Sequence, residues 1–124
     1  MPEARSRTFK TKWFAKAARK ALIPDAQLCK AIVEVRAGQA DDLGGGVFKK
    51  RLDKNRQRSI VLAKSRRYWV YAYLFAKNDR ENITSAELDA FRELAKVYDS
   101  KTDADIAAEL VAGELTEICH ADQS

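Results

Sequence analysis

The chain has 124 residues, of which 46% are hydrophobic, and its 23 Lys or Arg against 18 Asp or Glu give a net charge of +5. This length suits one domain with one core, so we predict a single domain over residues 1–124, with a disordered N-terminus at 1–7 and a loose tail at 119–124. No apolar run is long enough to cross a bilayer, and the N-terminus lacks the apolar core of a signal peptide. The composition therefore excludes a membrane partner and predicts a cytoplasmic protein.

The basic residues are concentrated in one part of the chain. Residues 49–80 carry eleven Lys or Arg and two acids, whereas residues 81–124 carry three bases and eleven acids. This separation predicts a nucleic-acid surface backed by an acidic half, although for any single charge a solvated surface is the simpler interpretation. We also hypothesise that the acidic half shields the basic surface, so that deleting the residues after Ser100 strengthens RNA binding.

The N-terminal third predicts a strand followed by two helices. Residues 8–11 form a short strand, and apolar residues then recur at helical spacing over 13–21 until Pro24 interrupts them. Asp25 is the expected N-cap of a second amphipathic helix, which Gly38 ends.

The middle of the chain changes to a strand period after the triple glycine at 44–46, which we interpret as a turn. Three strand-like segments follow, at 47–52, 59–63 and 68–76. The simplest arrangement of three such segments with short turns is an antiparallel meander. In the first of them Lys49 and Arg51 fall on the polar side, and Lys50 falls on the apolar side.

The last third predicts helices again. A capping box at Thr84 and Glu87 begins one helix, and a further helix begins near Thr102 and stops at Gly113. Residues 115–118 form either a final strand or an unstructured tail. The predicted fold class is α+β: a small antiparallel sheet, made of the meander and the N-terminal strand, packed against N-terminal and C-terminal helices.

The two cysteines give no sign of a metal site or a disulfide framework. Cys29 and Cys119 are far apart, belong to no CxxC motif and have only His120 nearby, so we expect two free thiols. Neither a metal nor a cofactor is expected.

Four aromatic residues alternate along the third strand of the meander, at Trp69, Tyr71, Tyr73 and Phe75, and are expected to share one face. Such a face either stacks RNA bases or packs as core against a helix. Tyr71 and Tyr73 are the candidates for base stacking.

The chain resembles the RelE/HigB-like toxins of bacterial toxin-antitoxin modules over most of its length, from Thr8 to Ile118. The resemblance rests on four motifs: Phe9-Lys10-Thr11-Lys12-Trp13-Phe14, Leu43-Gly44-Gly45-Gly46-Val47-Phe48-Lys49-Lys50-Arg51, Phe75-Ala76-Lys77-Asn78 with Asn82-Ile83, and Ala112-Gly113-Glu114-Leu115. It implies a compact sheet flanked by helices and a metal-independent mRNA endonuclease that works on the ribosome. The implied partners are the ribosome, its mRNA and a cognate antitoxin.

The same resemblance implies a catalytic set. Lys49 and Arg51 match the basic pair that these toxins place against the scissile phosphate, Arg58 matches an arginine of the following strand, and Lys77 matches the basic residue that completes the site. The candidate RNA contacts around them are Lys50, Lys54, Arg56, Arg66, Arg67, Tyr71, Tyr73 and Asn78. The chain departs from the family pattern in its hairpin turn, where Asn55-Arg56-Gln57 replaces a glycine-rich sequence, and in lacking a tyrosine after the last strand.

Clustered cations are also able to cut RNA on chemical grounds. Cleavage without a metal requires that the 2′-hydroxyl lose a proton, that the phosphate's added charge be stabilised and that the departing 5′-oxygen be supported. Lys49 is the candidate base because neighbouring cations disfavour an ammonium ion. Arg51 and Arg58 are suited to the phosphate charge, and Lys77 to the leaving oxygen or to substrate placement. The alternatives are a non-catalytic nucleic-acid-binding module of the same fold, a ParE-like toxin of DNA gyrase and a degenerate toxin.

Overall fold

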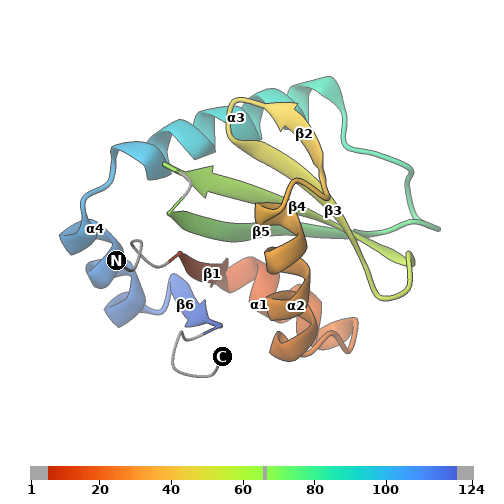
Figure 1. The fold of residues 1–124 in the computed structure, drawn as a ribbon, viewed down its shortest axis with the longest axis horizontal. Helices are drawn as coiled ribbons and strands as arrows, with labels where there is room; N and C mark the ends of the chain where they lie inside the picture. Colours follow the sequence, from red (N-terminus) through yellow and green to blue (C-terminus); the bar gives the residue numbers. More distant parts are fainter. Residues whose placement is uncertain (1–5, 66, 120–124) are drawn as a thin grey trace.

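A six-stranded sheet with the strand order β2-β3-β4-β5-β1-β6 organises the described part of the computed structural model, residues 6–65 and 67–119 (Figure 1). The strands are β1 (Arg7–Thr11), β2 (Asp41–Gly44), β3 (Val47–Leu52), β4 (Gln57–Lys64), β5 (Tyr68–Ala76) and β6 (Leu115–Ile118). The helices are α1 (Lys12–Lys20), α2 (Asp25–Arg36), α3 (Ser85–Ser100) and α4 (Asp103–Ala112).

The α+β fold class is confirmed, and the sheet is larger than predicted. Strands β3, β4 and β5 form the expected antiparallel meander, and β1 adds to it in parallel with β5. Strand β6 pairs antiparallel with β1, which decides the alternative left open for residues 115–118. Strand β2 was not expected, because its sequence of two aspartates, a leucine and a glycine has low strand propensity.

The sheet separates two hydrophobic cores. Helices α1 and α2 pack on one face, which we call the α1 face, and α3 and α4 pack on the other, which we call the α3 face (Figure 1). The core of the α1 face contains Phe14, Leu28, Ile32, Phe48, Leu52, Trp69 and Tyr71. The core of the α3 face contains Phe9, Val47, Ile60, Leu62, Phe75, Ala95 and Ile106. The two-residue period of each strand therefore assigns alternate side chains to different helical layers.

The helix ends largely follow the predicted signals. Both C-terminal helices begin with complete capping boxes, at Thr84 and Thr102. The predicted cap of α2 is wrong by one residue, because Pro24 occupies the N-cap with extended backbone and Asp25 lies in the first turn. The carboxylate of Asp25 accepts a hydrogen bond from Lys10 Nζ at 2.7 Å, so it ties the helix to β1.

A β-bulge corrects the prediction that four aromatic residues of β5 share one face. The register between β4 and β5 shifts just after Ile60, opposite the segment that joins Tyr71 to Tyr73. Before the shift, Trp69 and Tyr71 belong to the core of the α1 face, and after it Tyr73 and Phe75 pack on the α3 face. The extra residue reverses the alternation, which a strict period of two cannot predict.

A disulfide corrects the expectation of two free thiols. Cys29 of α2 is bonded to Cys119, the residue after β6, with a Cα–Cα distance of 5.3 Å and a sequence separation of 90. The two positions meet because α2 and Ile118 contribute to the same core. Spacing along the chain carries no trace of this proximity.

The chain ends are more extensively ordered than predicted. The expected disordered N-terminus, 1–7, reaches too far, because Arg7 begins β1, and Cys119 of the expected loose tail is held by the disulfide. The remaining parts of these segments, 1–5 and 120–124, lie outside the described residues. Among the helices of the described ranges, none has the combination of length and apolarity that a membrane span needs.

Candidate functional site

Strand β3 directs two of the predicted catalytic cations toward the α3 face. Val47 of the same parity is buried in that core, and Lys49 and Arg51 follow it at alternate positions. The Nζ of Lys49 lies 3.4 Å from Asn82 Oδ1 and 3.8 Å from a carboxylate oxygen of Asp41. Arg51 is exposed and forms no ion pair with any residue that the structure describes. Lys49 and Arg51 thus lie on one face of the sheet, and the Lys49 ammonium is in contact with oxygen atoms of Asn82 and Asp41.

Arg58 lies directly beside Arg51. The two arginines are paired in register across β3 and β4, and Phe75 of β5 is the next residue in the same row. Arg58 is only 8% exposed, and its Nη1 donates to the carbonyl oxygens of Asn55 (2.9 Å) and Gln57 (3.3 Å). Like charges opposite each other destabilise a sheet, and no described carboxylate pairs with either guanidinium. A bound anion would offset this repulsion.

The turn between β3 and β4 adds further cations at the end of the sheet. Lys54, Arg56, Lys77 and Asn78 border an open hollow of about 400 Å³ between this turn and the end of β5. The backbone N–H of Lys77 donates to the carbonyl oxygen of Arg56 at 2.9 Å, which fixes the end of β5 against the turn. Four of the predicted residues therefore border one hollow beside the arginine pair.

The turn between β3 and β4 contains no glycine, although three of its residues have positive φ. Asp53, Lys54 and Asn55 all have positive φ, between 53° and 74°. Asp and Asn tolerate this region better than other non-glycine residues. Arg56 Nη2 contacts the Asp53 carboxylate at 3.2 Å and closes the turn.

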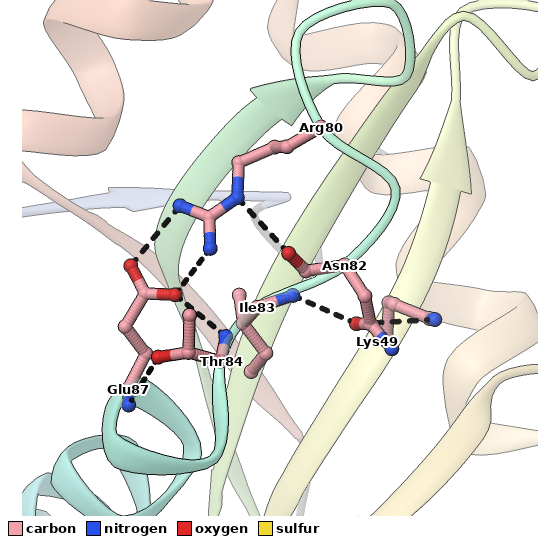
Figure 2. Close-up of polar contacts among 6 residues, drawn as sticks. All are labelled: Lys49, Arg80, Asn82, Ile83, Thr84 and Glu87. Atoms are coloured by element: carbon pink, nitrogen blue, oxygen red, sulfur yellow. Dashed lines mark hydrogen bonds and ion pairs between the residues drawn. The ribbon is translucent and has the colours of Figure 1, made fainter.

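A cluster that sequence reasoning missed lies next to Lys49, in the loop between β5 and α3 (Figure 2). Arg80 makes a two-pronged ion pair with Glu87, one prong being Nη1–Oε2 at 3.0 Å, and its Nε donates to the carbonyl oxygen of Asn82 at 3.0 Å. The Asn82 side-chain oxygen accepts from both Lys49 Nζ and the backbone N–H of Ile83. The Arg80 guanidinium also lies 5.6 Å from the centre of the Phe75 ring. Arg80 and Glu87 thus hold the loop that places Asn82 against Lys49.

The electrostatics of this cluster centre on Glu87. The guanidinium of Arg80 and the backbone N–H of Thr84 lower the pKa of the Glu87 carboxyl to about 2. The same contact raises the pKa of Arg80. The capping box identified Glu87 from the sequence as the start of a helix, but nothing in the spacing signals that its other carboxylate contacts lead to Arg80.

Several predicted RNA contacts lie elsewhere. Lys50 is on the α1 face, where its Nζ lies 2.8 Å from Glu34 and lowers the pKa of that carboxyl. Tyr71 is fully buried, its hydroxyl donates to the carbonyl oxygen of Leu28 at 2.7 Å, and burial raises its pKa. The fully buried Tyr71 ring offers no surface to an RNA base, so the prediction of base stacking there is wrong. The predicted RNA contact of Lys50 stays a prediction, on the other face of the sheet from Lys49.

Of two further predicted RNA contacts, Arg67 is distant from Lys49 and Tyr73 is packed between other aromatic rings. Arg67 follows the turn at the opposite end of β4 and β5, where its guanidinium lies 5.4 Å from the ring centre of Tyr68. Tyr73 faces the α3 side, but its ring stacks on Trp13 at 4.9 Å and contacts Phe91 at 5.7 Å. Arg66 lies outside the described residues.

The acidic C-terminal segment bears on the site only in part. Helix α3 supplies Glu87, whereas β6 forms the edge of the sheet opposite β2 and α4 packs against β6. Asp103 at the start of α4 accepts a hydrogen bond from Tyr68, at the far end of β5 from Phe75. The described residues after Ser100 thus approach the Tyr68 end of the sheet, near Lys64 and Arg67, and the hypothesis that they shield the basic surface stays a prediction.

The assembled cations suit an anionic phosphate more than a metal ion. In the described ranges, 6–65 and 67–119, no three His, Cys, Asp or Glu residues are grouped closely enough to hold a metal. Lys49, Arg51 and Arg58 share one face, and guanidinium groups bind phosphate oxygens in bidentate fashion.

Comparison with known proteins gives one family match for the sequence. The family model described as the RelE toxin of the RelE / RelB toxin-antitoxin system matches residues 6–118. Neither the curated proteins nor the solved structures gave a match.

Proposed function

Because the chain belongs to the RelE toxin family, we propose that it is a ribosome-dependent, metal-independent mRNA endonuclease that inhibits translation. Membership of the family makes the chain the toxin of a toxin-antitoxin module and implies a cognate antitoxin as its partner. In this proposal the toxin acts in the cytoplasm, on mRNA that the ribosome holds, and uses neither a metal nor a cofactor.

The observation that supports the proposal best is the adjacent pair of Arg51 and Arg58 with Lys49 on the same face. Two guanidinium groups opposite each other are unfavourable without an anion between or above them. A bridging phosphate gains two sets of charge-assisted hydrogen bonds at such a position. Arg58 is largely enclosed and Arg51 is exposed, so a phosphate reaching them from solvent meets Arg51 first.

The reaction that fits these groups is attack of a ribose 2′-oxygen on the adjacent phosphorus. Lys49, as the neutral amine, takes the proton of the 2′-hydroxyl and becomes an ammonium ion, and Arg51 and Arg58 stabilise the charge that develops on the phosphate oxygens. The bond from phosphorus to the 5′-oxygen then breaks, and the departing oxygen takes a proton from the Lys77 ammonium or from water. Lys77 supports that oxygen or places the substrate strand, and the products are a cyclic phosphate and a 5′-hydroxyl.

The hollow beside the hairpin turn gives the strand a path away from the reacting phosphate. Lys54, Arg56 and Asn78 border it together with Lys77, so neighbouring phosphates find cations and an amide there. These contacts are independent of base identity, and the choice of cleavage position then falls to the ribosome and the reading frame.

The proposal is tested by following mRNA on translating ribosomes with the purified protein, beside the same mRNA free in solution. The variant Lys49→Ala/Arg51→Ala is compared with Lys64→Ala/Arg67→Ala, which removes the same charge at the other end of β4 and β5. We expect cleavage only on ribosomes, by the parent protein and the control variant. Both variants must retain the parent's circular dichroism spectrum.

Two other outcomes would replace the proposal. Whole mRNA together with tight, salt-sensitive binding would indicate a non-catalytic binding module of the same fold. Whole mRNA together with inhibition of purified DNA gyrase would indicate a ParE-like toxin.

A further inference from the structure

Trp13 is an exposed aromatic residue at the point where β1 ends and α1 begins. It is 51% exposed, more than any other aromatic residue that the structure describes. A single exposed apolar side chain is common on protein surfaces and by itself indicates nothing. Trp13 differs because a second aromatic residue holds its ring in a fixed orientation.

The second aromatic residue is Tyr73 of β5. The ring centres of Trp13 and Tyr73 lie 4.9 Å apart and their planes are inclined by 27°, so the two rings are stacked. Tyr73 in turn contacts Phe91 of α3, at 5.7 Å between ring centres. Tyr73 therefore covers one face of the indole and is itself supported from behind, whereas the other face of the indole is open to solvent. A supported ring with one open face is the arrangement that stacks a nucleobase.

The local structure at the start of α1 directs Trp13 to this position. Strand β1 pairs with β5 only as far as Lys10, opposite Tyr71, and α1 then runs beside the rest of β5 (Figure 1). The ring of Phe14 packs against Tyr71 in the core of the α1 face, whereas the ring of Trp13 reaches Tyr73, which faces the α3 side. Trp13 thus contributes to the α3 face although its helix packs on the other one.

The stacked rings lie in register with the candidate site. Tyr73 is in the same row of the sheet as Lys49, with the buried Ile60 between them. Neighbouring strands are about 4.8 Å apart, so the backbones at Tyr73 and Lys49 are separated by about 10 Å. The next row contains Arg58 and Phe75, and the rings of Tyr73 and Phe75 lie 6.0 Å apart. A strand held by its phosphate at the arginine pair therefore places a neighbouring nucleotide near the stacked rings.

Arg80 connects the rings with the cations of the site. Its guanidinium lies 5.6 Å from the ring centre of Phe75, and its Nε donates to the carbonyl oxygen of Asn82. The pKa of Arg80 is raised mainly by Glu87 and further by the nearby phenol of Tyr73. A positive charge thus lies between the stacked rings and the contact of Asn82 with Lys49.

We propose that the open face of Trp13, supported by Tyr73, stacks on a base of the mRNA next to the phosphate that Arg51 and Arg58 bind. This inference rests on the proposed endonuclease and adds to it a substrate-binding residue outside the cation cluster. Every base has a π face, so the stack accepts all four bases and favours those that stack strongly. The stacked base fixes the position of the strand, and the cations then meet one phosphate.

The test measures binding of a single-stranded RNA of about five nucleotides in equilibrium titrations without ribosomes. The RNA carries 2′-O-methyl groups, so that it is not cleaved, and a series of such RNAs has one abasic nucleotide at each position in turn. The matched variants are Trp13→Leu and Trp13→Phe, because both keep an apolar side chain and only the second keeps a flat ring. Val111→Ala removes another exposed apolar side chain, on α4, and serves as the control.

We expect Trp13→Leu to weaken binding of the intact RNA by about 5- to 150-fold, the range for one base stacked on an aromatic residue. Trp13→Phe should retain most of the affinity, and Val111→Ala should match the parent protein. One abasic position should weaken binding to the parent by a similar factor and leave binding to Trp13→Leu unchanged. A purely structural role of Trp13 would not make these two losses overlap.

Several results would overturn the proposal. Equal losses in the Leu and Phe variants would show that the ring matters for packing only, and an abasic loss that persists in Trp13→Leu would place the base elsewhere. Absence of saturable binding by the parent would also contradict it. Unchanged RNA affinity in Trp13→Leu together with weaker binding of the cognate antitoxin would assign the ring to a protein interface.

The outcomes also separate this inference from the endonuclease. A parent protein that shows the stack but leaves mRNA whole on ribosomes would refute the endonuclease and leave the base site standing. A parent protein that cuts mRNA on ribosomes but binds the intact and abasic RNAs equally would refute the base site alone.

Discussion

The two faces of the sheet use their cations in opposite ways. On the α1 face the lysines of the sheet, Lys10 and Lys50, are neutralised by acids of α2, and the cations of the helices are unpaired. On the α3 face the helical cations are paired, and the sheet presents Arg51 and Arg58 without a described carboxylate partner. Each face therefore has cations without a described ion-pair partner. On the α1 face these cations belong to the helices, and on the α3 face they belong to the sheet.

This difference suggests different roles for the two faces: one attracts a polyanion in general, and the other orients a single phosphate for cleavage. A row of exposed lysines on a helix gives a broad, salt-dependent attraction for a polyanion. Two arginines fixed on neighbouring strands, one of them largely enclosed, hold a single phosphate in a defined orientation, as catalysis requires. The comparison predicts that substitutions on the α3 face change the rate of cleavage, whereas those on the α1 face change affinity.

The largest effect is expected from Arg51→Ala. Loss of one preorganised charge that stabilises a transition state lowers a rate by about 10²–10³-fold. Single-turnover cleavage on ribosomes measures the rate, and Arg67→Ala serves as the matched control because that arginine lies at the opposite end of the sheet. A rate within threefold of the parent protein for Arg51→Ala would remove the arginine pair from the mechanism.

The disulfide provides the next largest effect, on stability. It ties α2 of the α1 face to the end of β6 and closes a loop of 90 residues, so it restricts the unfolded chain. Reduction should lower the free energy of unfolding by about 2–4 kcal/mol, as removal of a long-loop disulfide typically does. Urea unfolding with and without a reductant measures the change.

The double variant Cys29→Ser/Cys119→Ser is the control for that experiment. It should match the reduced parent protein and be insensitive to reductant. Because reducing compartments keep such bonds open, the cleavage assay should be run in both states, and we expect the rate to be the same in both, since the disulfide is on the other face from Arg51. A reduced protein that fails to fold would contradict this expectation.

A smaller effect on the α3 face is expected from Glu87→Gln. The folded-state pKa of Glu87, about 2, is below the ordinary value, so its contribution to stability is present above about pH 4.3 and is lost as the pH falls through 2. The parent should therefore be more stable than Glu87→Gln at neutral pH, and the difference should shrink as the solution is acidified. Denaturant unfolding of both proteins over this pH range measures it.

The half-buried pair of Lys101 and Glu109 offers a matched control, because it is also formed by an acid and a cation of the α3 face. Glu109→Gln should leave ribosomal cleavage unchanged. Glu87→Gln should alter cleavage as well as stability, because Arg80 and Asn82 then lose the contact that places them beside Lys49. Equal cleavage by the two variants would show that the Arg80–Glu87 pair is structural only.

Much of this fold is readable in the sequence because it rests on local signals. The capping boxes at Thr84 and Thr102 and the alternation from Val47 to Leu52 mark elements whose backbone hydrogen bonds lie close by in the chain. The alternation also placed Lys49 and Arg51 on one face, apart from Lys50. Edge strand β2 was not predicted from the sequence, because its acidic residues are extended only through their pairing with β3.

The parts of the site that could not be predicted depend on contacts between distant segments. Arg80 is identified by its ion pair with Glu87, and Cys29 by a partner at the other end of the chain. The bulge after Ile60 places Tyr73 and Phe75 on the other face of the sheet from Trp69 and Tyr71, and so divides the four aromatic residues between the two cores. A pattern of apolar and polar positions does not reveal one inserted residue in a strand that is buried on both faces, because the pattern is equally compatible with either assignment of alternate residues to the two faces.

The smallest effect is expected from Lys50→Ala, which also tests the difference between the two faces of the sheet most directly. Lys49 and Lys50 are chemically identical neighbours, but the strand places Lys49 beside Asn82 on the α3 face and Lys50 beside Glu34 on the α1 face. Removing Lys50 should leave single-turnover cleavage within twofold of the parent protein, whereas Lys49→Ala should reduce it by about 10²-fold, the range for loss of a general base. Because each variant loses one lysine, net charge cannot separate them. Equal losses in the two variants would mean that general attraction for RNA, and not the face of the strand, sets the rate.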